Sequence, residues 1–502
     1  MSPNLSRNVP FFPALLALSG LAGCAPPIAE FECIHDEPLC QTIEVLADPR
    51  PLTRGLDITG LYLYQGVENQ LFWAGQDVTP EWPIVLHRDA EFRIFVTAHN
   101  DWDARDVTGR VYLYRDGELL AAFQSDAHIA GSSIASDLAS TVNVRLPGSV
   151  FTTGVLFKIE LVEKDPDYET HEALDGVPTF PEGDYGVLSP EDLGDSIRIL
   201  LIPIEYTADL SGRLPDTSPT QIALYEETVW AFFPTPLVEI EVADEPMESE
   251  ISITAMDTSG WASLLMRVSE AREEYGADDD QYVYGVFEPT DTFEGYCSGG
   301  CVTGMSNLAS NASDPYFRSS IGVGYPGITS AETMVHELGH AHGRMHSPGC
   351  GAADPDPTYP NATGHIDVSG LDLRDDSLKS PDVYFDFMSY CQPYWVSGFT
   401  FDRLATRIAI VNGVLAQGTP LSWSTLWVLP DGSMAWGQDR TFVGQPSGVP
   451  VTVDLVLPDG RILGEVDAFF SSLPSLKDSG VLSVRTGPWS AVRYADRTSP
   501  PR

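Results

Sequence analysis

The segment HELGHAHGRMH runs from His336 to His346 and holds four of the ten histidines of this 502-residue chain. On a helix, His336 and His340 lie on one face, one turn apart, as two ligands of a single metal ion must. Glu337 directly follows the first histidine, so its carboxylate lies beside such an ion and can hold and deprotonate a water molecule there. Gly343 lets the backbone reverse, which brings His346 back as a third ligand. Three nitrogen ligands leave a coordination position open, which is typical of catalytic rather than structural zinc.

The helix that carries this segment has a predicted start of its own. Thr329 stands three residues before Glu332, a capping box that predicts a helix beginning near Ser330. His342 lies about 200° around that helix from His340, so we expect a residue on the surface or behind the ligands rather than a ligand. The competing interpretation is that these histidines are scattered over a polar helix and bind no metal.

A second segment, YFDFMSYC, lies downstream and contains Met388 and Tyr390. Together with HELGHAHGRMH, which matches the pattern HExxHxxGxxH, it resembles the zinc signature and methionine turn of the metzincin zinc endopeptidases. The resemblance implies an α+β domain over residues 195–417, with a mixed twisted sheet, a zinc helix and a methionine turn. It also implies that Met388 packs beneath the histidines and that Tyr390 binds the metal and swings toward the oxyanion, as in astacin-like and serralysin-like members. Without the resemblance, Met388 is a core methionine and Tyr390 an aromatic residue of the pocket wall.

The resemblance also implies an activity. Zinc would lower the pKa of a water molecule, Glu337 would take its proton, and the hydroxide would attack a peptide carbonyl. We therefore expect a zinc-dependent endopeptidase with one catalytic Zn²⁺ ion, with Glu337 and Tyr390 as catalytic residues and His336, His340 and His346 as ligands. The alternative is a noncatalytic surface adhesin or glycan-binding lipoprotein with a structural or relic metal site, against which the intact Glu337 argues.

Further contacts around this site are also predicted. An extended substrate is expected to pair with an edge strand at Ser319 to Tyr325. Tyr394 and Trp395 are expected to wall the pocket, with core packing as an equal interpretation for Trp395. The acid-rich loop from Asp354 to Asp376 could bind calcium, but a solvated acidic loop is favoured.

The first residues resemble an export signal. Arg7 precedes the apolar run PFFPALLALSGLAG, which is too short for a stable membrane span and leads into the tetrapeptide LAGC, closing at Cys24. The tetrapeptide resembles the bacterial lipobox, which implies that residues 1–23 are removed and that a lipid on Cys24 anchors the chain at the outer membrane or cell surface. The alternative is an ordinary signal peptide cleaved near Ala22. With the β domain that follows, these features resemble secreted bacterial proteases that cut mucin-type glycoproteins.

Charge excludes several kinds of partner. The chain has 72 Asp and Glu residues against 28 Lys and Arg residues, a formal net charge of −44. Such a polyanion repels nucleic acid and anionic lipid, so we expect no nucleic-acid partner and no membrane contact beyond the N-terminal lipid. The expected partner is a protein or glycoprotein substrate, bound by a monomer with a solvated acidic surface.

Six further cysteines fit an exported protein, because disulfides form in oxidising compartments. They are Cys33, Cys40, Cys297, Cys301, Cys350 and Cys391. Proximity in the sequence suggests the pairs Cys33–Cys40 and Cys297–Cys301, which leaves Cys350 with Cys391, although the sequence alone leaves other pairings open. None of the six has the spacing of a structural zinc site.

Hydrophobic periodicity divides the chain into parts. Short alternating runs such as FRIFVTAH and RVYLYRDGELLAAF predict an antiparallel β-sandwich, and LPDG turns between short runs predict a small β domain near the C-terminus. Between them, helices and strands alternate. The expected order is signal peptide 1–23, tether 24–50, β-sandwich 51–165, linker 166–194, zinc metalloprotease domain 195–417 and C-terminal β domain 418–502.

Overall fold

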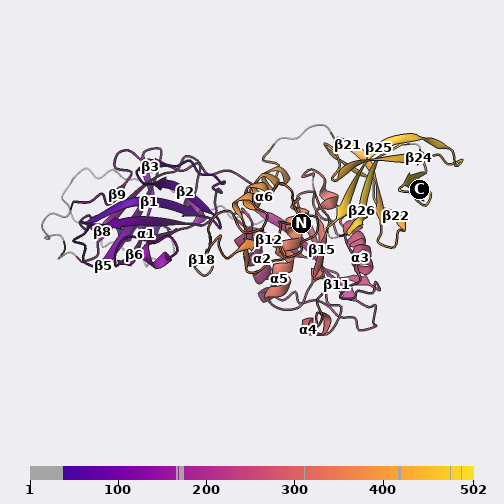
Figure 1. Ribbon diagram of the computed structural model, residues 1–502, viewed down its shortest axis with the longest axis horizontal. Helices are drawn as coiled ribbons and strands as arrows, with labels where there is room; N and C mark the ends of the chain where they lie inside the picture. The colour runs from indigo at the N-terminus through magenta and orange to yellow at the C-terminus, as the bar shows by residue number, and fades with distance from the viewer. Residues whose placement is uncertain are drawn as a thin grey trace, which may run out of the picture.

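The computed structural model describes residues 38–165, 168, 175–309, 311–415, 420–474, 476–487 and 489–502. The signal segment, Cys24 and Cys33 lie outside these ranges, as does the side chain of Cys40, so the predictions for them stay predictions. Three bodies of secondary structure follow one another along the molecule: an N-terminal pair of sheets, a central sheet with helices, and a C-terminal sheet (Figure 1). The chain is therefore sheet-rich and multidomain, as expected.

The N-terminal body consists of two antiparallel sheets that share one hydrophobic core. The first contains, in spatial order, β3 (Gln76–Asp77), β2 (Glu68–Trp73), β1 (Leu56–Tyr64), β4 (Ala90–Ala98) and β7 (Val142–Leu146). The second contains β10 (Gly186–Val187), β8 (Leu156–Glu163), β5 (Arg105–Arg115) and β6 (Glu118–Ile129), with β9 (Thr179–Phe180) paired to β8. Two short 3₁₀ turns, Leu138–Ser140 and Gly148–Val150, flank β7. Alternate residues such as Leu61 and Leu63 point into the core, which is the period of two expected from the sequence.

Two expected connecting segments contain regular structure. Helix α1 (Pro38–Ala47) lies in the expected tether and packs on β6, where the Thr42 hydroxyl accepts the N–H of Ala122 at 2.9 Å. Strands β9 and β10 lie in the expected linker and pair with β8. Regular structure therefore extends into the segments that the sequence analysis assigned to a tether and a linker. A few apolar side chains, such as the buried Val45, can pack on an existing sheet even where the composition is rich in proline and acid.

The central body is built on a six-stranded sheet in which only β15 runs antiparallel to its neighbour. Its order is β12 (Val238–Val242), β11 (Ile197–Tyr206), β14 (Tyr282–Phe287), β16 (Ser319–Val323) and β15 (Gly304–Ser306), with β13 (Met247–Ser249) also paired to β11. Strands β14 and β16 are buried along their whole length because both faces of the sheet are covered. Short elements complete this body: α4 (Phe293–Tyr296), a 3₁₀ turn (Pro315–Phe317), β17 (Gly370–Asp372), β18 (Ser377–Lys379), β19 (Phe385–Asp386) and β20 (Tyr394–Trp395).

Different layers cover the two faces of this sheet. One face carries α2 (Pro219–Phe232), α5 (Ile328–Ala341) and α6 (Gly398–Val411), which share a core with Ile199 and Leu201 of β11. The other face carries α3 (Thr258–Glu270), which shares a core with Leu200 and Ile202. Trp427 of the C-terminal sheet belongs to this second core as well. The C-terminal sheet therefore packs directly on the central body.

The C-terminal body is one antiparallel sheet of eight strands. Its order is β22 (Met434–Trp436), β21 (Pro420–Val428), β26 (Leu476–Arg485), β25 (Ile462–Leu473), β24 (Val449–Val456), β27 (Ala491–Tyr494) and β28 (Arg497–Thr498), with β23 (Arg440–Val443) paired to β21. The N–H of Gln438 donates to the Glu270 carboxylate at 2.8 Å, and Arg440 forms an ion pair with the buried Asp314. These polar contacts fix the sheet against α3 and the segment that follows β15.

A buried arginine joins the N-terminal body to the central one. The guanidinium of Arg88 is 1% exposed and donates to the carbonyl groups of Gln65, Trp230, Phe233 and Thr235. Because all four acceptors are backbone oxygens, the side chain is satisfied without an ion pair. The N-terminal sheets are therefore held against the C-terminal end of α2.

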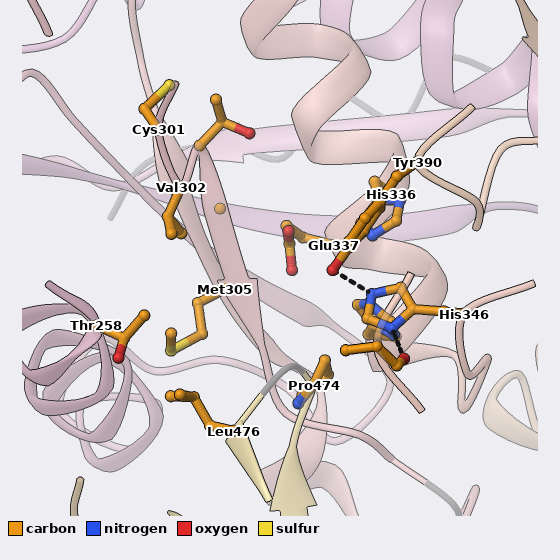
Figure 2. A pocket seen from close by; sticks show the side chains of 14 residues that line it. Thr258, Cys301, Val302, Met305, His336, Glu337, His346, Tyr390, Pro474 and Leu476 are labelled. Atoms are coloured by element: carbon orange, nitrogen blue, oxygen red, sulfur yellow. Dashed lines mark hydrogen bonds between the residues drawn. The ribbon is translucent and has the colours of Figure 1, made fainter. Parts of the chain in front are cut away.

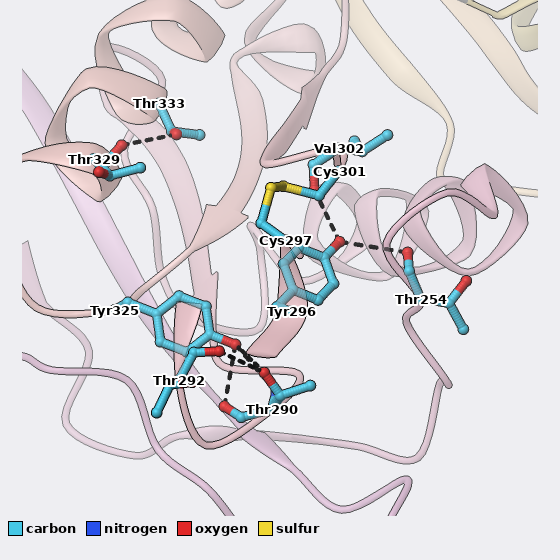
Figure 3. The surroundings of a disulfide bond; sticks show 10 residues. All are labelled: Thr254, Thr290, Thr292, Tyr296, Cys297, Cys301, Val302, Tyr325, Thr329 and Thr333. Carbon is cyan, nitrogen blue, oxygen red and sulfur yellow. Dashed lines mark hydrogen bonds between the residues drawn. A yellow bond between two sulfur atoms is a disulfide. The ribbon is translucent and has the colours of Figure 1, made fainter. Parts of the chain in front are cut away.

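Two predictions about the central body are wrong. Strand β16 lies between β14 and β15, so residues 319–325 do not form the edge of the sheet, which is β15. Helix α5 begins after Gly327, which has φ of 106°. The N–H and C=O of Gly327 form hydrogen bonds with the side-chain amide of Gln221. The predicted capping box is not formed. Thr329 instead accepts the Thr333 hydroxyl at its carbonyl oxygen, at 2.9 Å (Figure 3). The partner that starts the helix is distant in sequence, so a local pattern does not reveal it.

Candidate metal centre

Helix α5 and the reversal that ends it position the histidines. The helix carries His336, Glu337 and His340, and the chain then turns at Gly343, which has φ of 82° and donates its N–H to the carbonyl of His340 at 2.8 Å. This left-handed conformation favours glycine. The reversal brings His346 back against the helix face, as the spacing HxxGxxH predicts.

Three backbone carbonyl groups fix the orientation of the imidazole rings. Nδ1 of His336 lies 2.9 Å from the oxygen of Phe387, Nδ1 of His340 lies 2.6 Å from that of Arg344, and Nδ1 of His346 lies 2.6 Å from that of Ala353. A carbonyl oxygen can only accept, so each Nδ1 carries the ring proton and donates it. Each Nε2 is left with a free lone pair, which is the tautomer that a metal-binding histidine needs.

The three Nε2 lone pairs meet at one place. The ligand atoms of His336, His340 and His346 lie within 4.8 Å of one another, and Nε2 of His340 is 3.2 Å from Nε2 of His346. Neither of these two nitrogens carries a proton, so their lone pairs repel unless a cation lies between them. The residues therefore fit a metal ion. In the part of the chain that the structure describes, no other group of His, Cys, Asp or Glu side chains gathers in this way.

Burial keeps the three rings neutral. It lowers the pKa of His336, and it lowers the pKa of His340 well below the usual value, with the neighbouring rings adding to the effect. Burial and then the charge of His336 lower the pKa of His346 to about 4. A neutral ring offers its lone pair to a metal at neutral pH without competition from a proton.

The carboxyl group of Glu337 lies between the histidines and the edge strand β15. A Cβ atom on Gly304 would lie 2.5 Å from Cγ of Glu337 and 2.7 Å from its Oε1, so only glycine leaves room for this side chain. Burial raises the pKa of Glu337 to about 8. A carboxyl group with a pKa near neutrality can both take and return a proton. The role of Gly304 could not be predicted from the sequence because the contact joins residues of two different elements.

A buried turn supports the helix from the other side. A Cβ atom on Gly339 would lie 2.2 Å from Sδ of Met388, so helix and methionine are in direct contact. The fully buried carboxylate of Asp386 accepts the N–H of Met388 at 2.9 Å, the N–H of Ser397 at 3.1 Å and the hydroxyl of Ser347 at 3.2 Å. Asp386 thus ties the turn to the start of α6 and to the segment after the third histidine. A single aspartate in an apolar run gave no signal for this role in the sequence.

Tyr390 stands at the mouth of the site. Its hydroxyl lies 3.2 Å from Nε2 of His346, and the residue is 46% exposed. Cys391, the residue after Tyr390, forms a disulfide with Cys350 in the loop after α5. The second predicted pair, Cys297–Cys301, is also disulfide-bonded and closes the loop before β15.

A cavity of about 480 Å³ opens in front of the histidines. Figure 2 shows His346 and Tyr390 on one side of it and Thr258, Met305 and Leu476 across from them. Leu476 begins β26, so the hairpin between β25 and β26 reaches the site from the C-terminal body. This wall gave no signal in the sequence, because Leu476 and the histidines belong to segments far apart along the chain.

Three aromatic residues near the histidines can now be placed. Trp395 is 2% exposed and packs on Phe232 with ring centroids 4.7 Å apart, and Tyr394 packs on the same ring, so neither lines the cavity. The expected place in the pocket wall is therefore wrong for Tyr394, and the core interpretation holds for Trp395. His342 does not belong to the group of candidate ligands, as expected, and is completely buried, with its ring stacked on Tyr282 and the centroids 4.1 Å apart. Apolar neighbours on the sheet side of α5 cover this polar ring.

The acid-rich loop uses its carboxylates within the protein. Asp356 accepts the N–H and hydroxyl of Thr358, Asp372 forms an ion pair with Arg374 at 2.8 Å, and Asp376 pairs with Arg145. Turn formation and ion pairing account for these acids, so a calcium site gains no support here.

No protein-family model matches the chain, and no curated protein matches it. Among solved structures, a chaperone–substrate complex is similar with 13% identity and a TM-score of 0.24, over 47% of this chain and 40% of that one. A calcium-binding mutant of Bacteroides uniformis β-glucuronidase 2 is similar with 11% identity and a TM-score of 0.17, over 48% of this chain and 26% of that one. The chain thus spans less than half of either structure. The interpretation of the site rests on its own residues.

The two disulfides indicate an oxidising compartment outside the cytoplasm. Among the described residues, no helix has the length and apolar character needed to cross a membrane.

Proposed function

We propose that this protein is a zinc-dependent endopeptidase that hydrolyses peptide bonds in extracellular proteins. The observation that carries the proposal is the convergence of three Nε2 lone pairs and the buried carboxyl group of Glu337 on one cavity. A ligand set made only of nitrogen favours zinc over calcium or magnesium, which prefer oxygen ligands. A purely structural metal site would need neither the open cavity nor the acid beside it.

Each group at the site has a separate role in the proposed reaction. When bound, zinc supplies a Lewis acid that polarises the substrate carbonyl and acidifies water. Glu337 holds the attacking water, takes its proton and passes it to the leaving amine nitrogen. The Tyr390 hydroxyl, close to His346, donates a hydrogen bond to the oxyanion that develops on the substrate.

The edge strand β15 offers a place for the substrate backbone. The N–H of Val323 donates to the carbonyl of Thr303 at 2.8 Å, so Thr303 faces β16. In an antiparallel ladder the next residue, Gly304, then directs its N–H and C=O away from the sheet. An extended peptide can pair with these groups as an added strand, and because Gly304 lies against Glu337, the scissile bond of that peptide would then lie near the Glu337 carboxyl group.

The finer parts of the proposal rest on the sequence. Lipidation of Cys24 would hold the protease at the cell surface, and the resemblance to mucin-cutting enzymes points to glycoprotein substrates. The noncatalytic adhesin is the alternative that the following experiment separates.

The test compares the full-length protein with Glu337→Gln and with the control Glu332→Gln, a half-buried glutamate on the same helix. Each is incubated with a mixture of unfolded proteins, and the cut sites are mapped by mass spectrometry. We expect cleavage by the wild type and by the control, and a rate at least about 100-fold lower for Glu337→Gln with an unchanged metal content. Metal in all three proteins and cleavage by none would favour the adhesin.

A further inference from the structure

A second cavity, of about 650 Å³, lies between α6 and the C-terminal sheet. Three arginines line it: Arg344 from the loop after α5, and Arg403 and Arg407 from α6. Asn311 and Gln445 lie at the same cavity, and the Asn311 side-chain amide donates to the carbonyl of Gln445 at 2.6 Å. The chain has a net charge of −44 and only 28 Lys and Arg residues, so a cluster of three arginines at one cavity is unusual for it.

No carboxylate pairs with these cations. Within the described ranges, none of the three arginines forms an ion pair, and their side chains donate only to backbone carbonyls: Arg403 to Phe399 at 3.4 Å and Arg407 to Ala309. Arg407 is 7% exposed, yet its Nη1 has no hydrogen-bond partner, and neither does the buried Nε of Arg344. Three guanidinium groups that line one cavity repel one another, and among the described residues no ion pair with a carboxylate offsets that repulsion.

The charges around these arginines also leave their repulsion uncompensated. Burial lowers the pKa of Arg407 to about 10, and the charges of Arg318 and Arg344 add to the effect. Three nearby carboxylates have other partners: Asp314 pairs with Arg440, Asp386 accepts the N–H of Met388, and Asp356 accepts the N–H and hydroxyl of Thr358. In the described part of the chain, Asp402, next to Arg403 on α6, forms no ion pair with any of the three arginines.

We propose that this cavity binds an oxyanion, a sulfate or phosphate group that is either free or carried as an ester on a larger molecule. Guanidinium groups match the geometry of such oxygens and donate charge-assisted hydrogen bonds to them. The guanidinium groups of Arg344, Arg403 and Arg407, which line the cavity, would supply these donors. The group would also relieve the repulsion among the three arginines.

The oxyanion site is joined to the metal centre through the backbone. The carbonyl of Arg344 is the acceptor that orients His340, at 2.6 Å from its Nδ1. The reversal at Gly343 touches the same group of arginines, because a Cβ atom there would lie 2.4 Å from Nη2 of Arg407. An oxyanion that holds the Arg344 side chain would therefore help to hold His340. This coupling rests on the proposed metal site, whereas oxyanion binding itself does not.

The test is calorimetric titration of the full-length protein with sulfate and with phosphate, at an ionic strength held constant with chloride. The variants are Arg403→Ala, a half-buried residue whose loss leaves the core intact, and Arg407→Lys, which keeps the charge. The control is Arg461→Ala, an exposed residue paired with Asp459 on the C-terminal sheet. Glu337→Gln separates this proposal from the proposed activity, since it leaves the arginines untouched.

We expect one saturable site in the wild type, in Arg461→Ala and in Glu337→Gln, and an affinity about tenfold lower in Arg403→Ala and Arg407→Lys, as the loss of one charge-assisted hydrogen bond predicts. A sugar sulfate that binds tighter than inorganic sulfate would assign the site to a group on a larger molecule, and the reverse order would assign it to the free ion. Absence of saturable binding in the wild type, or wild-type affinity in both arginine variants, would overturn the proposal.

Discussion

At the scale of single residues, the site depends on glycines that leave space for functional side chains. Gly304 makes room for the carboxyl group of Glu337, and Gly339 makes room for the sulfur of Met388. Both positions are constrained by a neighbour from another element rather than by backbone conformation. A methyl group at either position would therefore act on the site directly.

Gly304→Ala tests this idea at the proposed general base. The added Cβ would meet Cγ of Glu337 at 2.5 Å, so the carboxyl group must move away from the position proposed for the attacking water. We expect kcat to fall at least about tenfold with an unchanged zinc content, because a misplaced base loses part of its contribution to catalysis. Gly299→Ala is the control, since a Cβ atom there meets nothing within 4 Å. Wild-type turnover in Gly304→Ala would contradict the role given to Glu337.

The lowered pKa of His346 predicts how the site responds to acid. A histidine whose folded-state pKa is depressed stays neutral as pH falls through the usual range near 6.5 and is protonated only near its own pKa, about 4 here. Protons therefore compete with the metal only in strong acid. We expect the protein to retain its zinc at pH 5.5 and to lose it as the pH falls through about 4, as followed by dialysis and elemental analysis. Loss of zinc at pH 6.5 would contradict the environment described for these rings.

At the scale of elements, the loop that precedes β15 is held by covalent and polar contacts. The disulfide Cys297–Cys301 closes the loop, and the hydroxyl of Tyr296 donates to the carbonyl of Val302 at 2.8 Å (Figure 3). The N–H of Val302 donates in turn to Ala255 at 2.8 Å. Cys301 and Val302 both line the cavity, so these contacts shape the approach to the edge strand.

Replacement of both Cys297 and Cys301 by serine should affect binding more than stability. A disulfide that closes so short a loop removes little entropy from the unfolded chain, so we expect only a small change in Tm. The loosened loop should raise KM several-fold while kcat changes little, because His336, Glu337 and His340 lie on α5 and His346 lies on the reversal that follows it. Steady-state kinetics with Ser298→Ala as the control would measure this. An unchanged KM would show that the loop does not order the substrate site.

At the scale of the whole molecule, the C-terminal sheet is part of the site rather than an appendage. Its core residue Trp427 packs with the central body, and Pro474 and Leu476 of its β25–β26 hairpin line the cavity. Together with Met305 they form an apolar wall, which favours a substrate with an apolar side chain at that position.

Leu476→Glu should change specificity without changing the metal site. A charge on the apolar wall would disfavour apolar side chains in the substrate, so we expect kcat/KM for peptides with an apolar residue at that position to fall about tenfold or more. Leu463→Glu, an exposed position on β25, is the control. Equal peptide preferences in the two variants would show that the hairpin does not contact the substrate.

The histidine spacing, the disulfide Cys297–Cys301 and the sheet-rich architecture could be predicted from the sequence because each depends on local periodicity or proximity, whereas Cys350–Cys391 followed only as the remaining pair. The edge position of β15, the role of Asp386 and the hairpin wall at Leu476 could not, since each depends on which distant segments meet. The start of α5 is the clearest case. Thr329 and Glu332 form a good local capping pattern, yet the side chain of Gln221 binds Gly327 and sets the helix start earlier.

The most direct test of the central claim is a zinc titration of the metal-free full-length protein, with hydrolysis of a fluorescent peptide followed in the same sample. The account predicts that activity is absent without metal, rises in proportion to added zinc and stops rising at one equivalent, and that His340→Ala recovers none of it. Hydrolysis by the metal-free protein, or zinc bound at one equivalent without hydrolysis of any peptide, would contradict it.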